Sequence, residues 1–199
     1  MKALGIVFSA RKKGNCLNSV EYVLGKLKEQ GFKTEIVNAY DCEIKSCRHC
    51  NYECFAKELR GKAEECPIQD DVPKIYKKMQ EADVIVFAVP TYGGKAASLY
   101  CAFTERGQGI IRSYEEFKST VLSKIIAIIV IGNIRAGGDL AYHMVILDHH
   151  DCENFSSVLL QSKEYGKGSI CGNLLEDEKV RDRLEDQAKF IIKKWKSKR

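Results

Sequence analysis

The stretch ADVIVFAV at residues 82–89 decides the fold class, because Asp83 is its single polar residue. A near-continuous apolar run of this length is typical of a strand that is buried on both faces. A second such run, KIIAIIVI, occupies residues 124–131. Strands of this kind belong to parallel sheets that carry helices on both sides, so an α/β protein is predicted.

The segments around these two runs alternate between strand and helix periodicity. Further strands are predicted at residues 2–8, 34–40 and 155–161, and helices at residues 17–31, 70–81, 139–150 and 176–196. This alternation specifies a doubly wound parallel sheet, whose ligands bind at the carboxyl ends of the strands near the switch point. Functional residues are therefore expected in three loops, residues 9–16, 90–95 and 132–138.

The composition indicates one globular domain over residues 1–199, with 45% hydrophobic residues, 30% charged residues and a net charge of +5. No apolar run approaches the roughly 20 residues of a membrane span, and the mixed charges do not indicate nucleic-acid binding. The short amino-terminal apolar run is followed at once by the cations at residues 11–13, so a cytoplasmic protein is predicted. In that setting nine cysteines indicate thiol, metal or redox chemistry more than a disulfide framework.

The loop SARKKGNC at residues 9–16 is a candidate phosphate site. It leads from a strand into a helix and carries three cations, the hydroxyl of Ser9 and a glycine, Gly14. Backbone N–H groups and the dipole at a helix amino terminus favour a phosphate. The loop matches neither G-x-G-x-x-G nor the Walker P-loop, so a Rossmann dinucleotide site or an ATP site is disfavoured. The alternative is an ordinary turn with solvated lysines.

The loop after the third strand has the residues of a site for a flat ring. Pro90 is expected to end the strand because it lacks an N–H donor, and Gly93 and Gly94 allow close backbone approach. Tyr92 is expected to stack on the ring or to hydrogen-bond its edge. A turn with a surface tyrosine is the alternative.

Four cysteines lie in an insertion, residues 42–66, that fits neither helix nor strand periodicity. Their spacing is Cys47-x2-Cys50-x3-Cys54-x11-Cys66. Four close thiolates are what Zn²⁺ or an iron–sulfur cluster requires, and Pro67 follows the last cysteine as in bacterial ferredoxin-type sites. Cys42 and His49 are further candidate ligands. A cluster, structural zinc, plain thiols and a redox disulfide remain open.

Other cysteine and histidine residues are interpreted as structural and not as parts of a site. The isolated Cys101, Cys152 and Cys171 are interpreted as small buried hydrophobic residues. The pair His149-His150 is interpreted as a solvated helix end, because adjacent side chains on a helix do not face each other. No nucleophile and base stand at a recognisable spacing, so no side chain is predicted to be catalytic.

Taken together, these motifs resemble the flavodoxin-like NAD(P)H-dependent FMN reductase family. The FMN phosphate loop of that family, Ser-x-Arg-x-x-Gly/Ser-Asn-Ser/Thr, is matched by Ser9, Arg11, Gly14 and Asn15. Cys16 stands in place of the last hydroxyl residue. Residues 90–93 resemble the segment Ser-Pro-x-Tyr beside the isoalloxazine ring, and residues 103–106 resemble Phe-x-Asp-Arg. The resemblance spans about residues 1–160.

The resemblance implies a three-layer αβα sandwich around a five-stranded parallel sheet of order 2-1-3-4-5. It also implies noncovalently bound FMN. The cofactor-binding residues would be Ser9, Arg11, Lys13, Gly14, Asn15, Cys16, Pro90, Thr91, Tyr92, Gly93, Gly94, Gly132 and Asn133.

The cysteine segment and the following CPIQDD at residues 66–71 resemble the iron–sulfur flavoprotein branch of the same family. The gaps x3 and x11 are wider than those usual in that branch. This resemblance implies a [4Fe–4S] cluster on Cys47, Cys50, Cys54 and Cys66. Its implied function is electron transfer between a carrier, ferredoxin or NAD(P)H, and a small acceptor.

Two alternatives to electron transfer remain, and a homo-oligomer is expected. One alternative is a cluster-free NAD(P)H-dependent FMN or quinone reductase, and the other is a zinc-stapled binding module without redox activity. A homodimer or homotetramer is expected, because one small flavodoxin-like domain leaves a bound flavin open to water and closed symmetric oligomers are the usual solution. The insertion at residues 42–66 is expected to cover the flavin of a neighbouring subunit.

Overall fold

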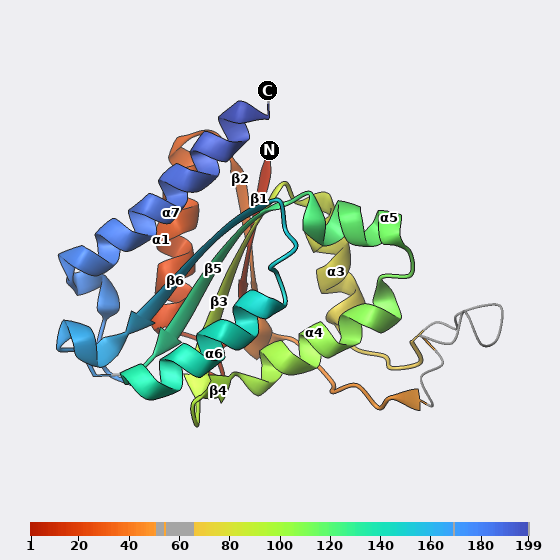
Figure 1. The fold of residues 1–199 in the computed structure, drawn as a ribbon, viewed down its shortest axis with the longest axis horizontal. Helices are drawn as coiled ribbons and strands as arrows, with labels where there is room; N and C mark the ends of the chain where they lie inside the picture. Colours follow the sequence, from red (N-terminus) through yellow and green to blue (C-terminus); the bar gives the residue numbers. More distant parts are fainter. Residues whose placement is uncertain (51–53, 55–65, 169, 199) are drawn as a thin grey trace.

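The computed structural model describes residues 1–50, 54, 66–168 and 170–198, with backbone only at residues 135–137. In this part of the chain, one parallel sheet lies between two layers of helices (Figure 1). Its parallel strands are β1 (Lys2–Val7), β2 (Lys33–Asn38), β3 (Val84–Tyr92), β5 (Ile125–Gly132) and β6 (Asn154–Gln161). The order β2-β1-β3-β5-β6 is the predicted flavodoxin-like order 2-1-3-4-5, so the α/β fold class is confirmed.

A sixth strand, β4 (Lys95–Ala96), pairs antiparallel with the end of β3, so the predicted count of five strands is wrong. The connection is the two-residue turn Gly93-Gly94, where φ is 56° and 77°. Positive φ at both positions is what a type I′ hairpin turn requires. The hairpin also carries β3 two residues past Pro90, which therefore does not end the strand as predicted.

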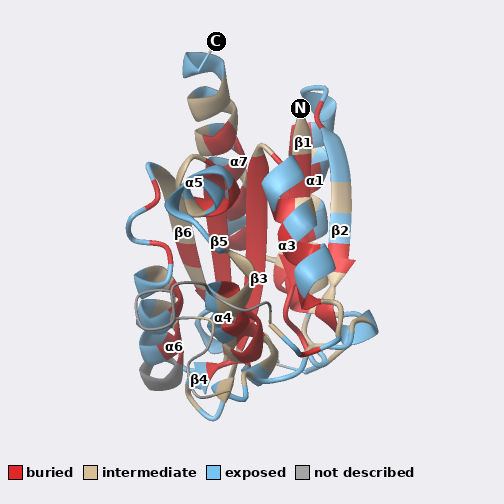
Figure 2. Ribbon diagram, turned by 90° about the vertical axis from the view of Figure 1, so that its right-hand side faces the viewer, coloured by how far each residue is buried: buried red, intermediate tan, exposed pale blue. Residues whose placement is uncertain are grey.

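The two apolar runs that predicted the fold class occupy the centre of the sheet. All residues of β5 are buried, as are Val84–Pro90 of β3. Figure 2 shows β1, β3 and β5 in the colour of buried residues, with β2 paler at the edge. Burial on both faces is confirmed for the central strands.

Helices cover the two faces of the sheet unequally (Figure 1). One face carries α1 (Asn15–Glu29) and α7 (Glu178–Ser197), and the other carries α3 (Val72–Glu81), α4 (Ser98–Ile110) and α6 (Arg135–Leu147). A short helix, α5 (Tyr114–Phe117), and the turn η3 (Lys118–Leu122) lead into β5. Each face has its own hydrophobic core.

Two helices differ from the sequence prediction. No residue range was predicted for α4, and α6 begins at Arg135, four residues before the predicted start. The loop after β5 therefore comprises Asn133 and Ile134, not the whole of residues 132–138. Among the described helices, none has both the length and the apolar character needed to cross a bilayer.

The predicted insertion follows β2 and a short turn, η1 (Ala39–Asp41). Residues 42–48 run without regular secondary structure along the molecule towards α4 (Figure 1), and a turn follows at His49 and Cys50. Residues 66–71 lead back into α3, while 51–53 and 55–65 lie outside the described residues.

Candidate flavin site and cysteine centre

The turn between β1 and α1 has the geometry of an anion site. Gly14 is the N-cap residue of α1, with φ 152°, and it has no side chain to cap the first-turn N–H groups. Arg11 packs over this position, since a Cβ on Gly14 would lie 3.3 Å from the Arg11 Cζ. The Arg11 N–H donates to the Ser9 Oγ at 3.2 Å. A hydroxyl, a helix start and a guanidinium therefore converge on one turn, and this combination fits a phosphate monoester.

The other residues predicted for the phosphate differ in their surroundings. Asn15 is buried, and its Oδ1 accepts a hydrogen bond from the Leu174 N–H at 3.0 Å. Lys13 is exposed. Cys16 is buried, and burial raises the pKa of its thiol to about 12, although the charge of Arg11 acts in the opposite direction. The thiol is therefore neutral at physiological pH and does not repel an anion.

The loop after β3 reaches the phosphate turn directly. Tyr92 accepts a hydrogen bond at its hydroxyl from the Ala10 N–H, at 3.1 Å. Thr91 borders the end of β5, because a Cβ on Gly132 would lie 3.5 Å from the Thr91 Oγ1. The predicted residues of the loops after β1, β3 and β5 are thus adjacent at one edge of the sheet.

The segment after β6 completes this edge and was not predicted from the sequence. The Asn133 Oδ1 accepts from the Ser162 hydroxyl at 3.1 Å, and the Asn133 carbonyl accepts from the Lys163 N–H at 3.1 Å. Farther on, the Ile170 carbonyl accepts from the Arg11 Nη1 at 2.7 Å. The sequence signal is a glycine-bearing turn after the fifth predicted strand, where Gly166 has a left-handed φ of 61°.

Arg106 on α4 fastens both described limbs of the cysteine segment. It is 1% exposed, and its Nη1 and Nη2 donate to Asp70 at 2.7 and 3.4 Å. It also donates to the carbonyls of Lys45 and Ile68, at 3.2 and 3.3 Å. The sequence FTER at residues 103–106 resembles the family's Phe-x-Asp-Arg motif, but this resemblance does not indicate the role of Arg106. The buried pair therefore fixes residues 42–50 and 66–71 against α4.

The guanidinium of Arg106 remains charged in this environment. Burial lowers its pKa, but the hydrogen bond from Arg106 to Asp70 and the charge interactions with Asp70 and Cys66 outweigh burial, so the pKa is raised. A permanent positive charge therefore lies beside one of the four predicted metal ligands.

The four predicted metal cysteines are half-buried and arranged in two parts. Cys54 and Cys66 both border α4, since a Cβ on Gly109 would lie 3.7 and 3.2 Å from their Cβ atoms. Cys47 accepts at its Sγ from the His49 N–H at 3.4 Å, in a turn where φ is 59° at His49 and 29° at Cys50.

The donor chemistry of these thiols fits an iron–sulfur cluster, but the four thiols do not converge. Within the described ranges, no three side chains of His, Cys, Asp or Glu lie close enough together to hold a metal ion. The structure thus brings together two of the four predicted ligands and places the other two in a separate turn.

Two sequence interpretations are wrong. Cys171 is exposed, unlike Cys152, which is buried, and Cys101, which is half-buried. His149 is 5% exposed and stacks on Phe87 with ring centroids 4.9 Å apart, so it is not a solvated helix end. The reason is that α6 ends at Leu147, and the turn after it directs His149 inward.

The strand order places the chain in the class of flavodoxin-like α/β proteins. The family described as NADPH-dependent FMN reductase matches residues 1–151. The chain therefore belongs to that family.

Relatives of this chain carry the name predicted for the branch. An iron–sulfur flavoprotein of Methanocaldococcus jannaschii is 33% identical over 138 residues, which are 69% of this chain and 65% of that protein. The match thus spans less than two thirds of that relative's length. An iron–sulfur flavoprotein of Methanosarcina thermophila is 29% identical over 180 residues, which are 90% of this chain and 87% of that protein. The resemblance to the iron–sulfur flavoprotein branch is confirmed.

A solved structure supports the same fold. The azoreductase AzrA superposes with a TM-score of 0.66 at 15% identity, over 97% of this chain and 100% of that chain. At this identity the similarity shows the fold alone.

Proposed function

We propose that this protein is an FMN-dependent oxidoreductase that passes electrons from NAD(P)H or ferredoxin to a small acceptor. The observation that carries the proposal is the convergence of Ser9, Arg11 and the start of α1 on one turn, to which Tyr92 is hydrogen-bonded. Family membership supports the same cofactor. When bound, FMN supplies one- and two-electron chemistry.

The chain's own residues would bind and orient the cofactor. Ser9, Arg11 and the first N–H groups of α1 would hold the phosphate, with Lys13 adding positive charge from the surface. The ring would lie against residues 90–94 and against Gly132 and Asn133. No side chain at this edge needs to act as an acid or a base.

We further propose a [4Fe–4S] cluster on Cys47, Cys50, Cys54 and Cys66. Four half-buried thiols in a segment fastened to α4, together with the names of the relatives, support this. A cluster would convert two-electron reduction of the flavin into single-electron steps. The cluster-free reductase remains the second candidate, because no three of these thiols lie close enough together in the described residues to hold a metal ion.

The absorption spectrum and the metal and flavin content of the purified protein distinguish these functions. Protein purified without oxygen is expected to show flavin absorption bands with a broad brown shoulder, and to contain iron and acid-labile sulfide. Boiling is expected to release FMN and not FAD. Flavin bands without iron would support the cluster-free reductase, whereas zinc without flavin would support a binding module and overturn the proposal.

A further inference from the structure

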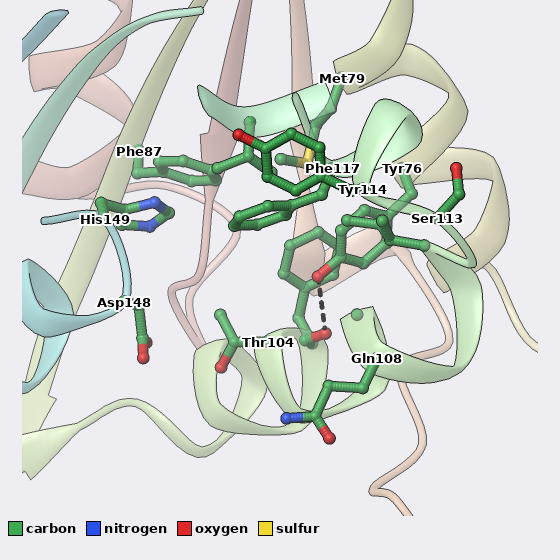
Figure 3. Close-up of a pocket in the computed structure, with 14 residues that line it drawn as sticks. Tyr76, Met79, Phe87, Thr104, Gln108, Ser113, Tyr114, Phe117, Asp148 and His149 are labelled. Atoms are coloured by element: carbon green, nitrogen blue, oxygen red, sulfur yellow. Dashed lines mark hydrogen bonds between the residues drawn. The ribbon is translucent and has the colours of Figure 1, made fainter. Parts of the chain in front are cut away.

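A cavity of about 410 Å³ lies between the sheet and helices α3, α4 and α5 (Figure 3). Five aromatic rings line it, those of Tyr76, Phe87, Phe103, Tyr114 and Phe117. Protein interiors hold few voids larger than a water molecule, and small-molecule sites measure about 300–1,000 Å³. The volume therefore lies within the range of small-molecule sites.

This cavity is separate from the candidate flavin site. Phe87 precedes Tyr92 by five residues on β3, which is about 16 Å along a strand that rises about 3.3 Å per residue. Among the described residues that line the cavity, none belongs to the phosphate turn or to the loops beside it. A ligand in this cavity would not occupy the position of the flavin.

Asp148 is an exposed residue that lines the cavity, and a buried hydrogen-bond chain holds its carboxylate. Its Oδ2 accepts from the Tyr100 hydroxyl at 2.7 Å, and Tyr100 is 1% exposed. The Tyr100 hydroxyl also lies 3.3 Å from the His149 Nε2. Because this hydroxyl donates to the carboxylate, it accepts from an Nε2–H of His149, which assigns the tautomer. The orientation of the carboxylate is thus fixed by two buried side chains.

The charge of Asp148 is not balanced by a cation in the described part of the chain. None of the ion pairs there includes Asp148. Partial burial of its side chain raises the pKa of Asp148, although the Tyr100 hydrogen bond opposes this. Burial also lowers the pKa of His149 to about 4, so the imidazole adds no positive charge near pH 7. A cationic ligand would therefore meet a carboxylate that forms no ion pair in the described part of the chain.

The remaining polar groups of the cavity are uncharged. Thr104 and Gln108 lie on the α4 wall, and Ser113 and Tyr114 lie opposite Asp148 (Figure 3). Aromatic faces attract organic cations, and a carboxylate forms a strong charge-assisted hydrogen bond with an ammonium group. Uncharged hydroxyl and amide groups suit a hydroxyl on the ligand's ring.

We propose that this cavity binds a small, single-ring aromatic amine in its protonated form. The ring lies among the aromatic side chains, and the ammonium group donates to Asp148. The site is independent of the flavin site, so its test does not depend on the redox activity.

The experiment is calorimetric titration of the purified holoprotein with tyramine at pH 7. One tyramine is expected to bind per chain with a dissociation constant below about 1 mM, without a change in the flavin absorption spectrum. Its anionic analogue 3-(4-hydroxyphenyl)propionate and the uncharged p-cresol are expected to bind at least about tenfold more weakly. Absence of saturable binding, or p-cresol binding as tightly as tyramine, overturns the proposal.

Substitutions locate the binding and test the charge. Asp148→Asn keeps the shape of the side chain but is expected to weaken tyramine binding at least about tenfold. Asp151→Asn changes an exposed aspartate three residues away and is expected to leave binding unchanged. An unchanged affinity in the Asp148 variant contradicts the assignment.

Filling the cavity is the second test of position. Thr104→Phe is expected to abolish tyramine binding, and Gln108→Trp provides the same test from the same wall should the first variant fail to fold. Full binding by a folded variant, or a tyramine-induced shift of the flavin bands, would place the ligand elsewhere and reject this site.

Discussion

Arg11 brings a permanent positive charge to the start of α1, where the phosphate of FMN is proposed to bind. Arg11→Ala is expected to weaken FMN binding by roughly 1.5–3 kcal/mol, which is the range for hydrogen bonds to charged groups. This corresponds to roughly 10- to 150-fold, measured by fluorescence titration of the apoprotein with FMN. Lys12→Ala is the control, because Lys12 is exposed and pairs with Asp41. An unaltered FMN affinity in the Arg11 variant would contradict the proposal that this turn binds the phosphate.

His149 makes the folded protein sensitive to acid. Its pKa is lowered by burial from 6.5 to about 4, so the unfolded chain takes up a proton at a higher pH than the folded one. The stability from neutral His149 is therefore complete above about pH 6.5 and is lost as pH falls towards 4, by about 3 kcal/mol at 1.36 kcal/mol per pKa unit.

Urea unfolding at a series of pH values between 7.5 and 4.5 measures this loss. His149→Gln is expected to flatten the pH dependence, whereas His150→Gln, at an exposed position, is expected to preserve it. Parallel pH profiles for the wild type and the His149 variant would show that burial of this imidazole does not contribute.

At the scale of elements, the buried ion pair of Arg106 with Asp70 is central to the described contacts between the cysteine segment and α4. Asp70→Asn leaves the Arg106 charge without its partner, and breaking such a pair costs about 3–5 kcal/mol. Asp186→Asn alters an exposed pair with Lys189 on α7, away from the segment, and is expected to have a much smaller effect. Chemical denaturation of both variants compares them, and equal losses would contradict the role of the buried pair.

The cysteine segment is also the element on which the cluster depends. Cys50→Ser and Cys66→Ser each remove one of four proposed anchors, so iron and acid-labile sulfide are expected to fall sharply while FMN remains bound. Cys101→Ser and Cys171→Ser are the controls, because both residues lie outside the segment. A wild type that carries no iron after anaerobic reconstitution would favour the cluster-free reductase.

Elements were predictable from the sequence where burial leaves a simple pattern. The runs at residues 82–89 and 124–131 predicted the central strands, because burial on both faces excludes polar residues. The sequence predicted no residue range for helix α4, because Gly107 and Gly109 interrupt its hydrophobic pattern and its buried positions include Arg106. That arginine is buried only because Asp70, distant in sequence, pairs with it.

The candidate site was likewise predictable only in part. The turn at residues 9–16 follows local rules for a helix start, so its location was predictable. The contacts of Ile170 with Arg11 and of Leu174 with Asn15 join segments that are far apart in sequence, and no local periodicity reports them. Convergence of four thiols likewise depends on tertiary placement, which spacing alone does not determine.

At the scale of the whole molecule, an apolar stripe on α6 bears on the predicted oligomer. Leu140, Met144 and Leu147 are 56%, 36% and 65% exposed, and their spacing places them on one side of the helix. Contiguous exposed apolar side chains mark association surfaces. This stripe supports the prediction that the protein is a dimer or tetramer.

Sedimentation equilibrium is expected to give a mass of two or four times the 22.5 kDa of one chain. Leu140→Lys combined with Leu147→Lys is expected to shift the protein towards monomer, because burying two added charges in an interface is costly. Gln30→Lys changes an exposed residue at the end of α1, on the face of the sheet opposite α6, and the same assembly is expected. A wild type that sediments as a stable monomer with full activity would refute the oligomer, and the shielding of the flavin would then have to come from the chain itself.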